Sequence, residues 1–319
     1  MIHKDNLSVN AMGGSEMMKY RLELEMEKME PGLLDKVQIV VSRERELVPD
    51  LPAIFWAQDL AEDNEAINAM GNGGWKKYTK IIFVSHWQKE RYVNLFDIPY
   101  SHCIVFPNCI DKFDESELDK NSEDNKIRLI YTPTPHRGLE ILVPVFEHIV
   151  RDMPDIHLDI FSSFNLYGWK ERDKAYEKLF ERIDAHPQMT NHGTVKNSVV
   201  RDYLGKSHIF AYPSIWKETS GITLIEAMSS RNLIVASDLA AIPETTSNHG
   251  VFYQYTENIQ DHASTFYSCL KGAIEFVKGT NYQLLNNTTL RSAKEYADFR
   301  NNWEFRAADW YNLLKKITD

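Results

Sequence analysis

Two glutamates on either side of a glycine, Glu218, Gly221 and Glu226, are the residues whose types and spacing best suit the binding of a sugar attached to a diphosphate. Carboxylates accept hydrogen bonds from sugar hydroxyl groups. Backbone N–H groups at the start of a helix, together with the helix dipole, favour a phosphate. At about 1.5 Å per residue, Glu226 would lie roughly 9 Å along such a helix, which is close to the span from a terminal phosphate to a ribose.

The sequence around these residues predicts a strand that leads directly into a helix. The apolar run His208–Tyr212 predicts a short buried strand, which the following Pro-Ser pair ends. Apolar residues at helical spacing begin at Ile222, with Thr219 or Ser220 as the expected N-cap, so free N–H groups are expected around Gly221. Two glutamates at this separation are also common on a solvated helix face, so their spacing alone does not establish a binding site.

The full string YPSIWKETSGITLIEAM resembles the donor-site motif of family 4 glycosyltransferases, which are retaining enzymes of GT-B fold that use nucleotide-sugar donors. In that motif a Pro-Ser turn precedes the first glutamate, a glycine opens the helix and Glu-Ala-Met closes the motif. The matching positions here are Pro213-Ser214, Glu218, Gly221 and Glu226-Ala227-Met228. The resemblance implies that the donor-binding residues include Thr219, Ser220, Gly221, Ile222 and Glu226.

The composition indicates a globular chain that is long enough for two α/β domains. Of its 319 residues, 43% are hydrophobic and 12% are aromatic. The formal net charge of −10 argues against nucleic acid, which binds basic surfaces, and against an anionic membrane as the main partner. A local basic patch would still permit peripheral membrane contact.

The cysteine content and the lack of long apolar runs indicate a cytoplasmic protein. Cys103, Cys109 and Cys269 are too few and too scattered for a disulfide framework or a zinc site. No apolar run is long enough to span a membrane, and Met1–Asn10 lacks the apolar core of a signal peptide.

A glycine pair and a later turn resemble the acceptor side of the same family. Gly13-Gly14 precedes a predicted helix, as the family's N-terminal glycine loop does, although an ordinary helix start would also explain the pair. The family has a β-strand before this loop, but residues 1–12 do not predict one, so we expect a reduced N-terminal sheet. Asn108-Cys109 resembles the family's Asn-Gly turn at the interdomain cleft, with cysteine in place of glycine.

Gln58 and Asp59 follow the predicted strand Ala53–Trp56, at the carboxyl end where open α/β sheets bind ligands. Related sequences often have His-Asp at this point. Glutamine can hydrogen-bond a sugar hydroxyl but cannot exchange a proton near neutral pH. Asp59 is therefore the better candidate for contact with an acceptor; the alternative is that Asp59 caps the helix that follows.

Arg137 is the basic residue expected at the diphosphate. It lies between a predicted strand that ends near Tyr131 and a helix, where a fixed cation would stabilise the departing diphosphate. The family has Lys or Arg next to a glycine here and often a second cation five residues earlier, a position that Thr132 occupies. Gly193 and Val195 lie in a turn that resembles the one beside the nucleobase in the family.

These features predict an α/β protein of GT-B fold, in which two Rossmann-like domains face each other across a cleft and the N-terminal domain is reduced. We expect an acceptor-side domain over residues 1–112, an acidic solvated linker over residues 113–126 and a donor-binding domain over residues 127–290. Residues 291–319 are predicted to form a helix that packs back on the first domain.

The resemblance implies transfer of a hexose-type sugar from a nucleoside diphosphate sugar, of UDP or GDP type, to a glycan or another hydroxyl acceptor, as in polysaccharide biosynthesis. Glu218, Arg137 and Asp59 are the expected catalytic residues, and an oxygen of the diphosphate would take the acceptor's proton. The sequence contains no evident Asp-x-Asp metal motif, so we expect no metal and no cofactor.

Two other interpretations remain open at this point. A GT-B epimerase that hydrolyses its donor would share the fold, and a non-catalytic protein that binds a nucleotide sugar would share the motif. The reduced N-terminal region, Gln58 and Thr132 favour the second of these. The donor base, the donor sugar, the acceptor and the oligomeric state have no readable signal in the sequence.

Overall fold

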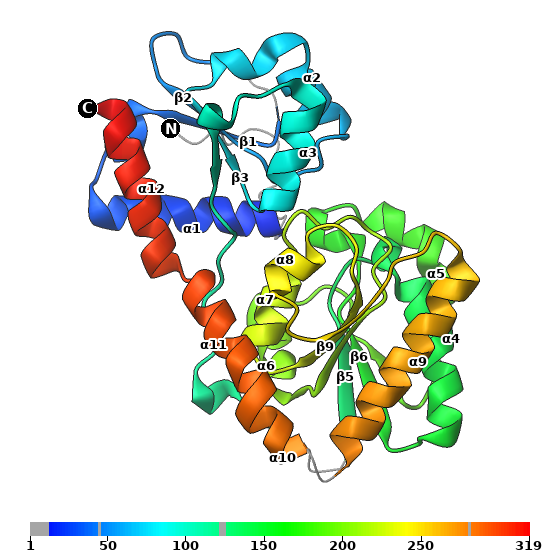
Figure 1. Ribbon diagram of the computed structural model, residues 1–319. Helices are drawn as coiled ribbons and strands as arrows, with labels where there is room; N and C mark the ends of the chain where they lie inside the picture. The colour runs from blue at the N-terminus through cyan, green and yellow to red at the C-terminus, as the bar shows by residue number, and fades with distance from the viewer. Residues whose placement is uncertain (1–12, 44–45, 121–125, 280–281) are drawn as a thin grey trace. The chain divides into compact units, whose positions relative to one another are not determined.

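The computed structural model describes residues 13–43, 46–120, 126–279 and 282–319. The chain forms two compact units (Figure 1). Unit 1 consists of residues 1–110 and 301–319, and unit 2 consists of residues 111–300. The chain therefore passes between the units twice, after Ile110 and after Arg300. In the described part of the chain, no helix combines the length and the apolar character that a membrane span requires.

A parallel sheet forms the centre of unit 1. Its four strands lie in the order β1-β2-β3-β4 and pair in parallel throughout. They are β1 (Gln38–Val41), β2 (Ala53–Trp56), β3 (Lys80–Phe83) and β4 (Cys103–Val105). Nearly continuous apolar runs form β1 to β3, as expected for a parallel sheet that is covered on both faces. The prediction that residues 1–12 contain no strand falls on residues outside the described ones.

Four helices cover the sheet of unit 1: α1 (Gly14–Met29), α2 (Asn64–Met70), α3 (His86–Phe96) and α12 (Trp303–Thr318). Residues of α2 and α3, among them Met70 and Tyr92, share a buried cluster with Phe55 and Phe83 of the strands. Helix α12 contributes the fully buried Trp310, whose ring packs edge-on against Trp56 at 4.9 Å. The last helix of the chain is thus part of the core of unit 1.

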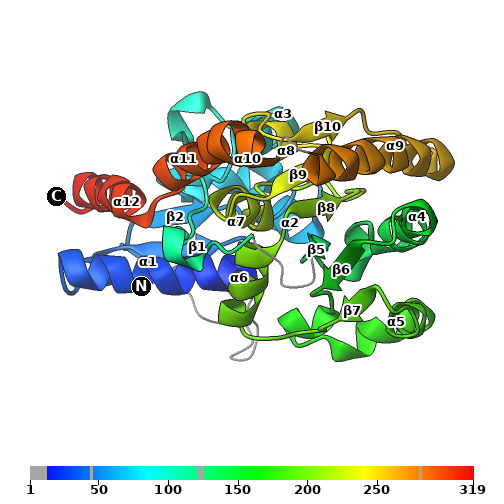
Figure 2. The same cartoon turned by 90° about the horizontal axis from the view of Figure 1, so that it is seen from below.

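Unit 2 contains a larger sheet, whose six strands lie in the order β10-β9-β8-β5-β6-β7 and are all parallel. The strands are β5 (Ile127–Tyr131), β6 (Ile156–Ile160), β7 (Met189–Asn191), β8 (Ile209–Tyr212), β9 (Leu233–Ser237) and β10 (Val251–Tyr253). Figure 2 shows helices on both faces of this sheet, with α4, α5 and α9 on one face and α6, α7 and α11 on the other. This is the doubly wound arrangement that the alternation of strands and helices predicts.

The helices of unit 2 are α4 (Leu139–Asp152), α5 (Glu177–Asp184), α6 (Asn197–Lys206), α7 (Ile222–Ser229), α8 (Ile242–Thr246), α9 (Ile259–Lys278), α10 (Tyr282–Leu285) and α11 (Arg291–Arg300).

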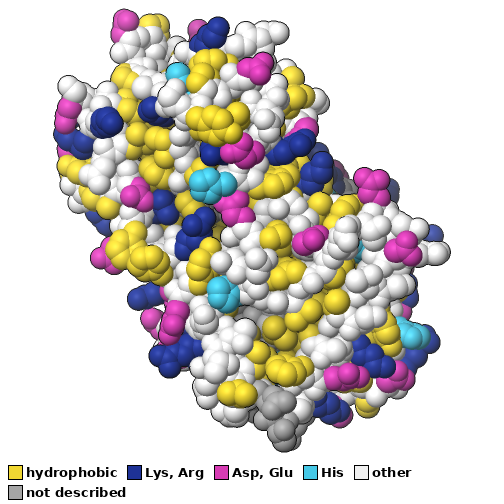
Figure 3. All heavy atoms as spheres, viewed as in Figure 1, with side chains coloured by type: hydrophobic (Ala, Val, Ile, Leu, Met, Phe, Trp, Pro, Cys, Tyr) yellow, Lys and Arg dark blue, Asp and Glu magenta, His cyan; other side chains and the backbone are white. Residues whose placement is uncertain are grey.

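On the face shown in Figure 3, basic and acidic side chains are interspersed. This face therefore has no continuous basic stripe of the kind that binds nucleic acid.

The predicted C-terminal helix is divided into two helices that belong to different units. Helix α11 packs against α7 in unit 2, whereas α12 belongs to unit 1. Asn302 caps α12, because its side-chain oxygen accepts a hydrogen bond of 2.7 Å from the backbone N–H of Glu304. The preceding Asn301 donates to the carbonyl oxygen of Asn108 at 2.7 Å. A continuous helix was therefore the wrong prediction, because side-chain hydrogen bonds at these asparagines replace helical ones.

The segment predicted as a solvated linker, residues 113–126, is described over residues 113–120 and 126; residues 113–120 belong to unit 2, and most of them are exposed. Phe113 is buried, and the guanidinium group of Arg201 lies 3.8 Å from the centre of its ring. Arg201 also donates hydrogen bonds to the carbonyl oxygens of Asp111 and Lys112. The acidic composition predicted an exposed segment; most of its described side chains are exposed, but Phe113 and the carbonyl groups just before it anchor the segment in unit 2.

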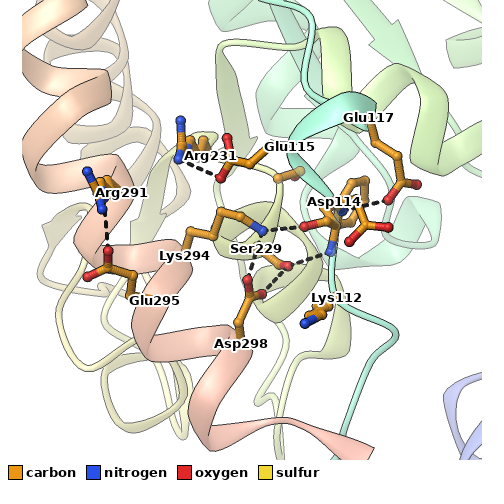
Figure 4. A network of polar contacts seen from close by, with 12 residues as sticks. Lys112, Asp114, Glu115, Glu117, Ser229, Arg231, Arg291, Lys294, Glu295 and Asp298 are labelled. Carbon is orange, nitrogen blue, oxygen red and sulfur yellow. Dashed lines mark hydrogen bonds and ion pairs between the residues drawn. The ribbon is translucent and has the colours of Figure 1, made fainter.

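A buried lysine connects this segment to α11 and α7 (Figure 4). Lys294 donates hydrogen bonds to the carbonyl oxygen of Phe113 and, at 2.8 Å, to Asp298. Ser229 donates to the other oxygen of Asp298 and accepts from the backbone N–H of Phe113 at 3.1 Å. The network thus holds both chain segments that leave unit 2 toward unit 1.

We expect Lys294→Met to lower the free energy of unfolding by about 2–4 kcal/mol, because it removes charge-assisted hydrogen bonds and leaves buried acceptors without a donor. Urea unfolding followed by circular dichroism measures this change. Lys278→Met is the matched control, because Lys278 contacts Asp155 at the surface; such an exposed pair contributes at most about 1 kcal/mol. Equal losses in the two variants would contradict the role of the network.

Candidate functional site

The strand order of unit 2 indicates where a ligand site is expected. From β5 the sheet continues through β6 and β7 on one side and through β8, β9 and β10 on the other. The connections after β5 and β8 therefore diverge to opposite faces, and ligands bind outside the carboxyl ends of strands at such a point. Arg137 follows β5, Tyr212 ends β8, and Glu218 follows β8.

Arg137 and Glu218, both predicted to be catalytic, form an ion pair at this point. Nη1 of Arg137 lies 2.6 Å from Oε1 of Glu218. The hydroxyl group of Tyr212 donates a hydrogen bond of 2.5 Å to the same oxygen. Glu218 is only 6% exposed, whereas the Arg137 side chain is 23% exposed, so the carboxylate is largely shielded from water. An ion pair in such surroundings is electrostatically stronger than one at the surface.

The electrostatic surroundings keep Arg137 charged. Burial alone would lower the pKa of Arg137, but the adjacent Glu218 carboxylate outweighs it and holds the pKa above its usual value. The guanidinium group also lies 5.7 Å from the ring centre of Trp216, which is a cation–π distance. Arg137 is therefore a fixed positive charge at the carboxyl end of β5.

The loop from Thr132 to Arg137 contains several buried polar atoms without a partner. Oγ1 of Thr132, Oγ1 of Thr134, Nδ1 of His136 and Nε of Arg137 have no hydrogen-bond partner among the described residues. Native proteins rarely leave buried polar groups unpaired, so such a cluster beside an ion pair indicates a place for a ligand. Hydroxyl and guanidinium groups suit a phosphate. The sequence interpretation treated Thr132 only as a missing cation and did not include Thr134.

His136 is held between aromatic rings and stays neutral near physiological pH. It stacks on Phe164 with ring centres 5.1 Å apart and contacts Trp216 edge-on at 4.7 Å. Burial, together with the neighbouring Arg137, lowers the pKa of His136 to about 4. The Arg137 side chain thus supplies the positive charge of this loop.

The helix that follows Glu218 begins at a glycine rather than at the expected Thr219 or Ser220. Gly221 is the N-cap of α7, with φ +77° and no side-chain cap. A side chain at Gly221 would be strained because of this positive φ, and its Cβ would also lie 2.9 Å from Cδ1 of Leu224. Ser220 is buried, and its carbonyl oxygen accepts a hydrogen bond of 2.6 Å from Thr245. The first-turn N–H groups, including that of Ile222, therefore lack a side-chain acceptor.

Glu226, predicted to bind the ribose, lies within α7 and is 6% exposed. Nδ2 of Asn197 contacts its Oε1 at 3.3 Å. Burial raises the pKa of Glu226. Glu226 is therefore not on a solvated helix face, which was the alternative interpretation of the two glutamates.

Gly193 and Val195 lie in the loop between β7 and α6, at the far end of the strand order from β10. Gly193 has φ +58°, and its N–H donates to the side chain of Asn191 at 3.1 Å. His192, just before it, stacks on Phe161 with ring centres 4.3 Å apart. The start of the loop is thus anchored at His192, whereas the space next to Gly193 is open and Val195 is half-buried.

The predicted acceptor-side residues all lie in unit 1. Gln58 and Asn108 are buried, and their side-chain amides exchange two hydrogen bonds of 3.2 and 3.1 Å. Gly13 is the N-cap of α1, and Gly14 is its first residue. With φ −69°, Gly13 has a backbone conformation that other residues also adopt, as in an ordinary helix start.

Asp59 does not cap the helix that follows it, because α2 begins at Asn64 with Asp63 as its N-cap. Burial, and next the nearby Asp63, raise the pKa of the Asp59 carboxyl group. Its backbone carbonyl oxygen accepts hydrogen bonds from Gln88 at 2.8 Å and Tyr92 at 3.3 Å. The position of Asp59 is therefore fixed by the start of α3.

We searched residues 13–43, 46–120, 126–279 and 282–319 for side chains that could bind a metal ion together. No group of three or more His, Cys, Asp or Glu residues in these ranges is placed to hold an ion.

The sequence is similar to known proteins mainly over unit 2. Residues 128–271 match the family described as Glycosyl transferases group 1. The gpi3 subunit of phosphatidylinositol N-acetylglucosaminyltransferase from Schizosaccharomyces pombe is 23% identical over 171 residues, which are 53% of this chain and 36% of that protein. The GPI3 subunit from Saccharomyces cerevisiae is 22% identical over 190 residues, which are 57% of this chain and 40% of that protein. The aligned region thus spans less than half the length of these curated relatives.

Several solved structures share the fold. Anabaena HepE in complex with UDP-glucose has a TM-score of 0.68 at 13% identity, covering 91% of this chain and 84% of that one. A glycosyltransferase from Rickettsia africae has a TM-score of 0.64 at 15% identity, covering 99% and 84%. The pneumococcal O-GlcNAc transferase GtfA, in complex with UDP and GlcNAc, has a TM-score of 0.65 at 13% identity, covering 94% and 60%. The fold is that of the GT-B glycosyltransferases, as predicted.

Proposed function

We propose that this protein transfers a sugar from a nucleoside diphosphate sugar to a hydroxyl acceptor with retention of the anomeric configuration. The observation that carries the proposal is the ion pair between half-buried Arg137 and buried Glu218, at the point where the strand order of unit 2 diverges. The uncapped start of α7 follows Glu218 directly. The match of residues 128–271 to a glycosyltransferase family supports the same reaction class.

The proposed mechanism assigns an electrostatic role to each of these groups. Negative charge grows on the diphosphate as the bond to the sugar breaks, and Arg137 together with the free N–H groups of α7 stabilises that charge. Glu218 accepts hydrogen bonds from hydroxyl groups of the donor sugar and orients it. An oxygen of the departing diphosphate takes the proton of the acceptor hydroxyl, so no protein side chain has to act as the base.

We propose a UDP sugar as the donor, and UDP-GlcNAc and UDP-glucose as the first donors to test. Both curated relatives are named as subunits of an N-acetylglucosaminyltransferase, and two of the structural neighbours contain UDP or UDP-glucose. Glu226, buried on α7, is the proposed contact for the ribose hydroxyl groups. The loop of Gly193 and Val195 is the proposed contact for the base.

A protein that binds a nucleotide sugar without catalysis is the second candidate. The amide group of Gln58 is engaged by Asn108, and a threonine occupies the position of the usual second cation. The two candidates differ in one measurable property, because only the enzyme releases UDP faster when an acceptor is added.

A donor panel tests the proposal and its metal dependence together. We expect purified protein with UDP-GlcNAc, UDP-glucose or GDP-mannose, and a panel of hydroxyl acceptors, to release nucleoside diphosphate and to form an α-linked product, whose linkage NMR identifies. We also expect less than about a twofold change with EDTA, because Arg137 supplies the charge that a metal would otherwise supply. Loss of activity with EDTA and its return with magnesium would disprove metal independence. Binding of donor without nucleotide release for any acceptor would favour the non-catalytic candidate.

A further inference from the structure

The tyrosine at the end of β8 makes a contact that the proposed mechanism does not yet use. The hydroxyl group of Tyr212 donates to Oε1 of Glu218 at 2.5 Å. The side chain of Tyr212 is fully buried, and its ring packs edge-on against Tyr131 at 6.1 Å and Phe210 at 6.0 Å. Burial, and next the Glu218 carboxylate, raise the pKa of Tyr212 well above its usual value. The phenol therefore stays protonated and remains a hydrogen-bond donor.

The two oxygens of Glu218 have different surroundings. Oε1 accepts hydrogen bonds from both Arg137 and Tyr212. Arg137 lies in the connection after β5, and Tyr212 is the last residue of β8. Among the described residues, none donates a hydrogen bond to Oε2. The protein thus holds one oxygen of the carboxylate and leaves the other for a ligand.

Arg137 cannot position Glu218 and bind a diphosphate through the same N–H group. Its guanidinium group has five N–H donors, and Nε is buried without a partner among the described residues. If Arg137 turns toward a bound diphosphate, its hydrogen bond to Glu218 weakens. Tyr212 has no such second task, because its side chain is fully buried and its single hydroxyl proton is already donated to Glu218.

We propose that Tyr212 is a positioning residue that keeps Glu218 oriented toward the donor sugar while Arg137 binds the diphosphate. This inference rests on the proposed function, because it assumes that Glu218 contacts the sugar. A purely structural tyrosine would affect folding stability and all ligands alike. A positioning residue affects only ligands and steps that depend on Glu218.

The test combines Tyr212→Phe, Glu218→Ala and the double variant. We expect Tyr212→Phe to lower kcat/KM for the active donor by about 10-fold or more, since it removes a hydrogen bond to a charged group. UDP, which has no sugar, should bind with a Kd within about twofold of wild type. In the Glu218→Ala background, Tyr212→Phe should change kcat/KM by less than about twofold, because residues that act as a unit are not additive.

Tyr253→Phe is the matched control, because it removes another buried hydroxyl group of unit 2, one that contacts His262. We expect this control to keep wild-type kinetics. The role of Tyr212 would be overturned if Tyr212→Phe lowered kcat/KM equally with and without the Glu218 side chain. It would also be overturned if Tyr212→Phe weakened the binding of UDP as much as the binding of the donor.

Equilibrium binding separates this inference from the proposed function. If wild-type protein binds UDP-GlcNAc or UDP-glucose but transfers no sugar, the transfer reaction is disproved. Tyr212→Phe should then still weaken the binding of the UDP sugar and not of UDP, and equal effects on both would overturn the inference. Wild-type protein that binds none of these nucleotide sugars would overturn both.

Discussion

Glu218→Gln and Arg137→Met are each expected to lower kcat/KM by about 100-fold to 1,000-fold, the range that is typical for loss of one fixed group that stabilises transition-state charge. Arg137→Met removes the positive charge next to the departing diphosphate. Glu218→Gln removes the negative charge that holds Arg137 at 2.6 Å and replaces one acceptor oxygen with an amide donor. Steady-state kinetics with the active donor, together with circular dichroism, measures activity and folding.

The double variant distinguishes a shared site from two separate defects. Because the two side chains contact each other, the combined loss should be much smaller than the product of the two single losses. Arg182 and Glu147 form the control pair, since they bridge the surface of α5 and α4 in the same unit. Arg182→Met and Glu147→Gln should keep kcat/KM within about twofold, because exposed ion pairs contribute little. Near-wild-type kinetics in the Arg137 and Glu218 variants would disprove this site.

The sequence predicted most strands of the two sheets and the donor-site motif, because both depend on local patterns; the short edge strands β7 and β10 were not predicted. Short apolar runs such as the one in β8 are typical of buried strands, and a parallel sheet buries them on both faces. Pro213 and Gly221 mark the end of that strand and the start of α7 for backbone reasons that hold in any fold. The resemblance assigned Arg137 and Glu218 to one reaction but did not predict the ion pair between them, and the strand order explains why they meet.

Contacts between distant segments could not be predicted in the same way. The hydrogen bond from Tyr212 to Glu218 depends on how the loop after β8 folds back, although the tyrosine was visible as the last residue of a predicted strand. The network of Lys294, Phe113 and Asp298 joins segments more than one hundred residues apart in the chain. Composition alone predicted a solvated segment there, because it does not reveal a single anchoring aromatic residue.

The N-cap of α7 shows how tertiary contacts override a local preference. Thr219 and Ser220 are typical N-cap residues. The backbone carbonyl group of Ser220 is instead bound by Thr245 from α8, and Gly221 makes the turn with a positive φ. With Gly221 as the N-cap, no capping side chain accepts from the first N–H groups of α7, whereas the sequence interpretation expected Thr219 or Ser220 to do so. This arrangement suits an anion better than a capped helix does.

Gly138→Ala is expected to lower the free energy of unfolding of unit 2 by about 2–5 kcal/mol and to abolish sugar transfer. Gly138 has φ +130°, a conformation that strains any residue with a side chain. A Cβ atom there would also lie 2.2 Å from the carbonyl oxygen of Pro213, so the backbone would have to move. Arg137 precedes Gly138 and Glu218 follows Pro213 in the two loops concerned, so such a movement would separate the pair.

Gly272→Ala provides the comparison, because Gly272 lies in α9 with open space around its Cβ position. Replacing a glycine in an exposed helix interior with alanine should raise stability by about 0.5–1 kcal/mol. Urea unfolding gives the stability of both variants, and kinetics with the active donor gives their activity. A Gly138→Ala variant as stable and active as Gly272→Ala would show that the loops after β5 and β8 do not need their close approach. In that case the Arg137–Glu218 pair would not depend on the close approach of Gly138 to Pro213.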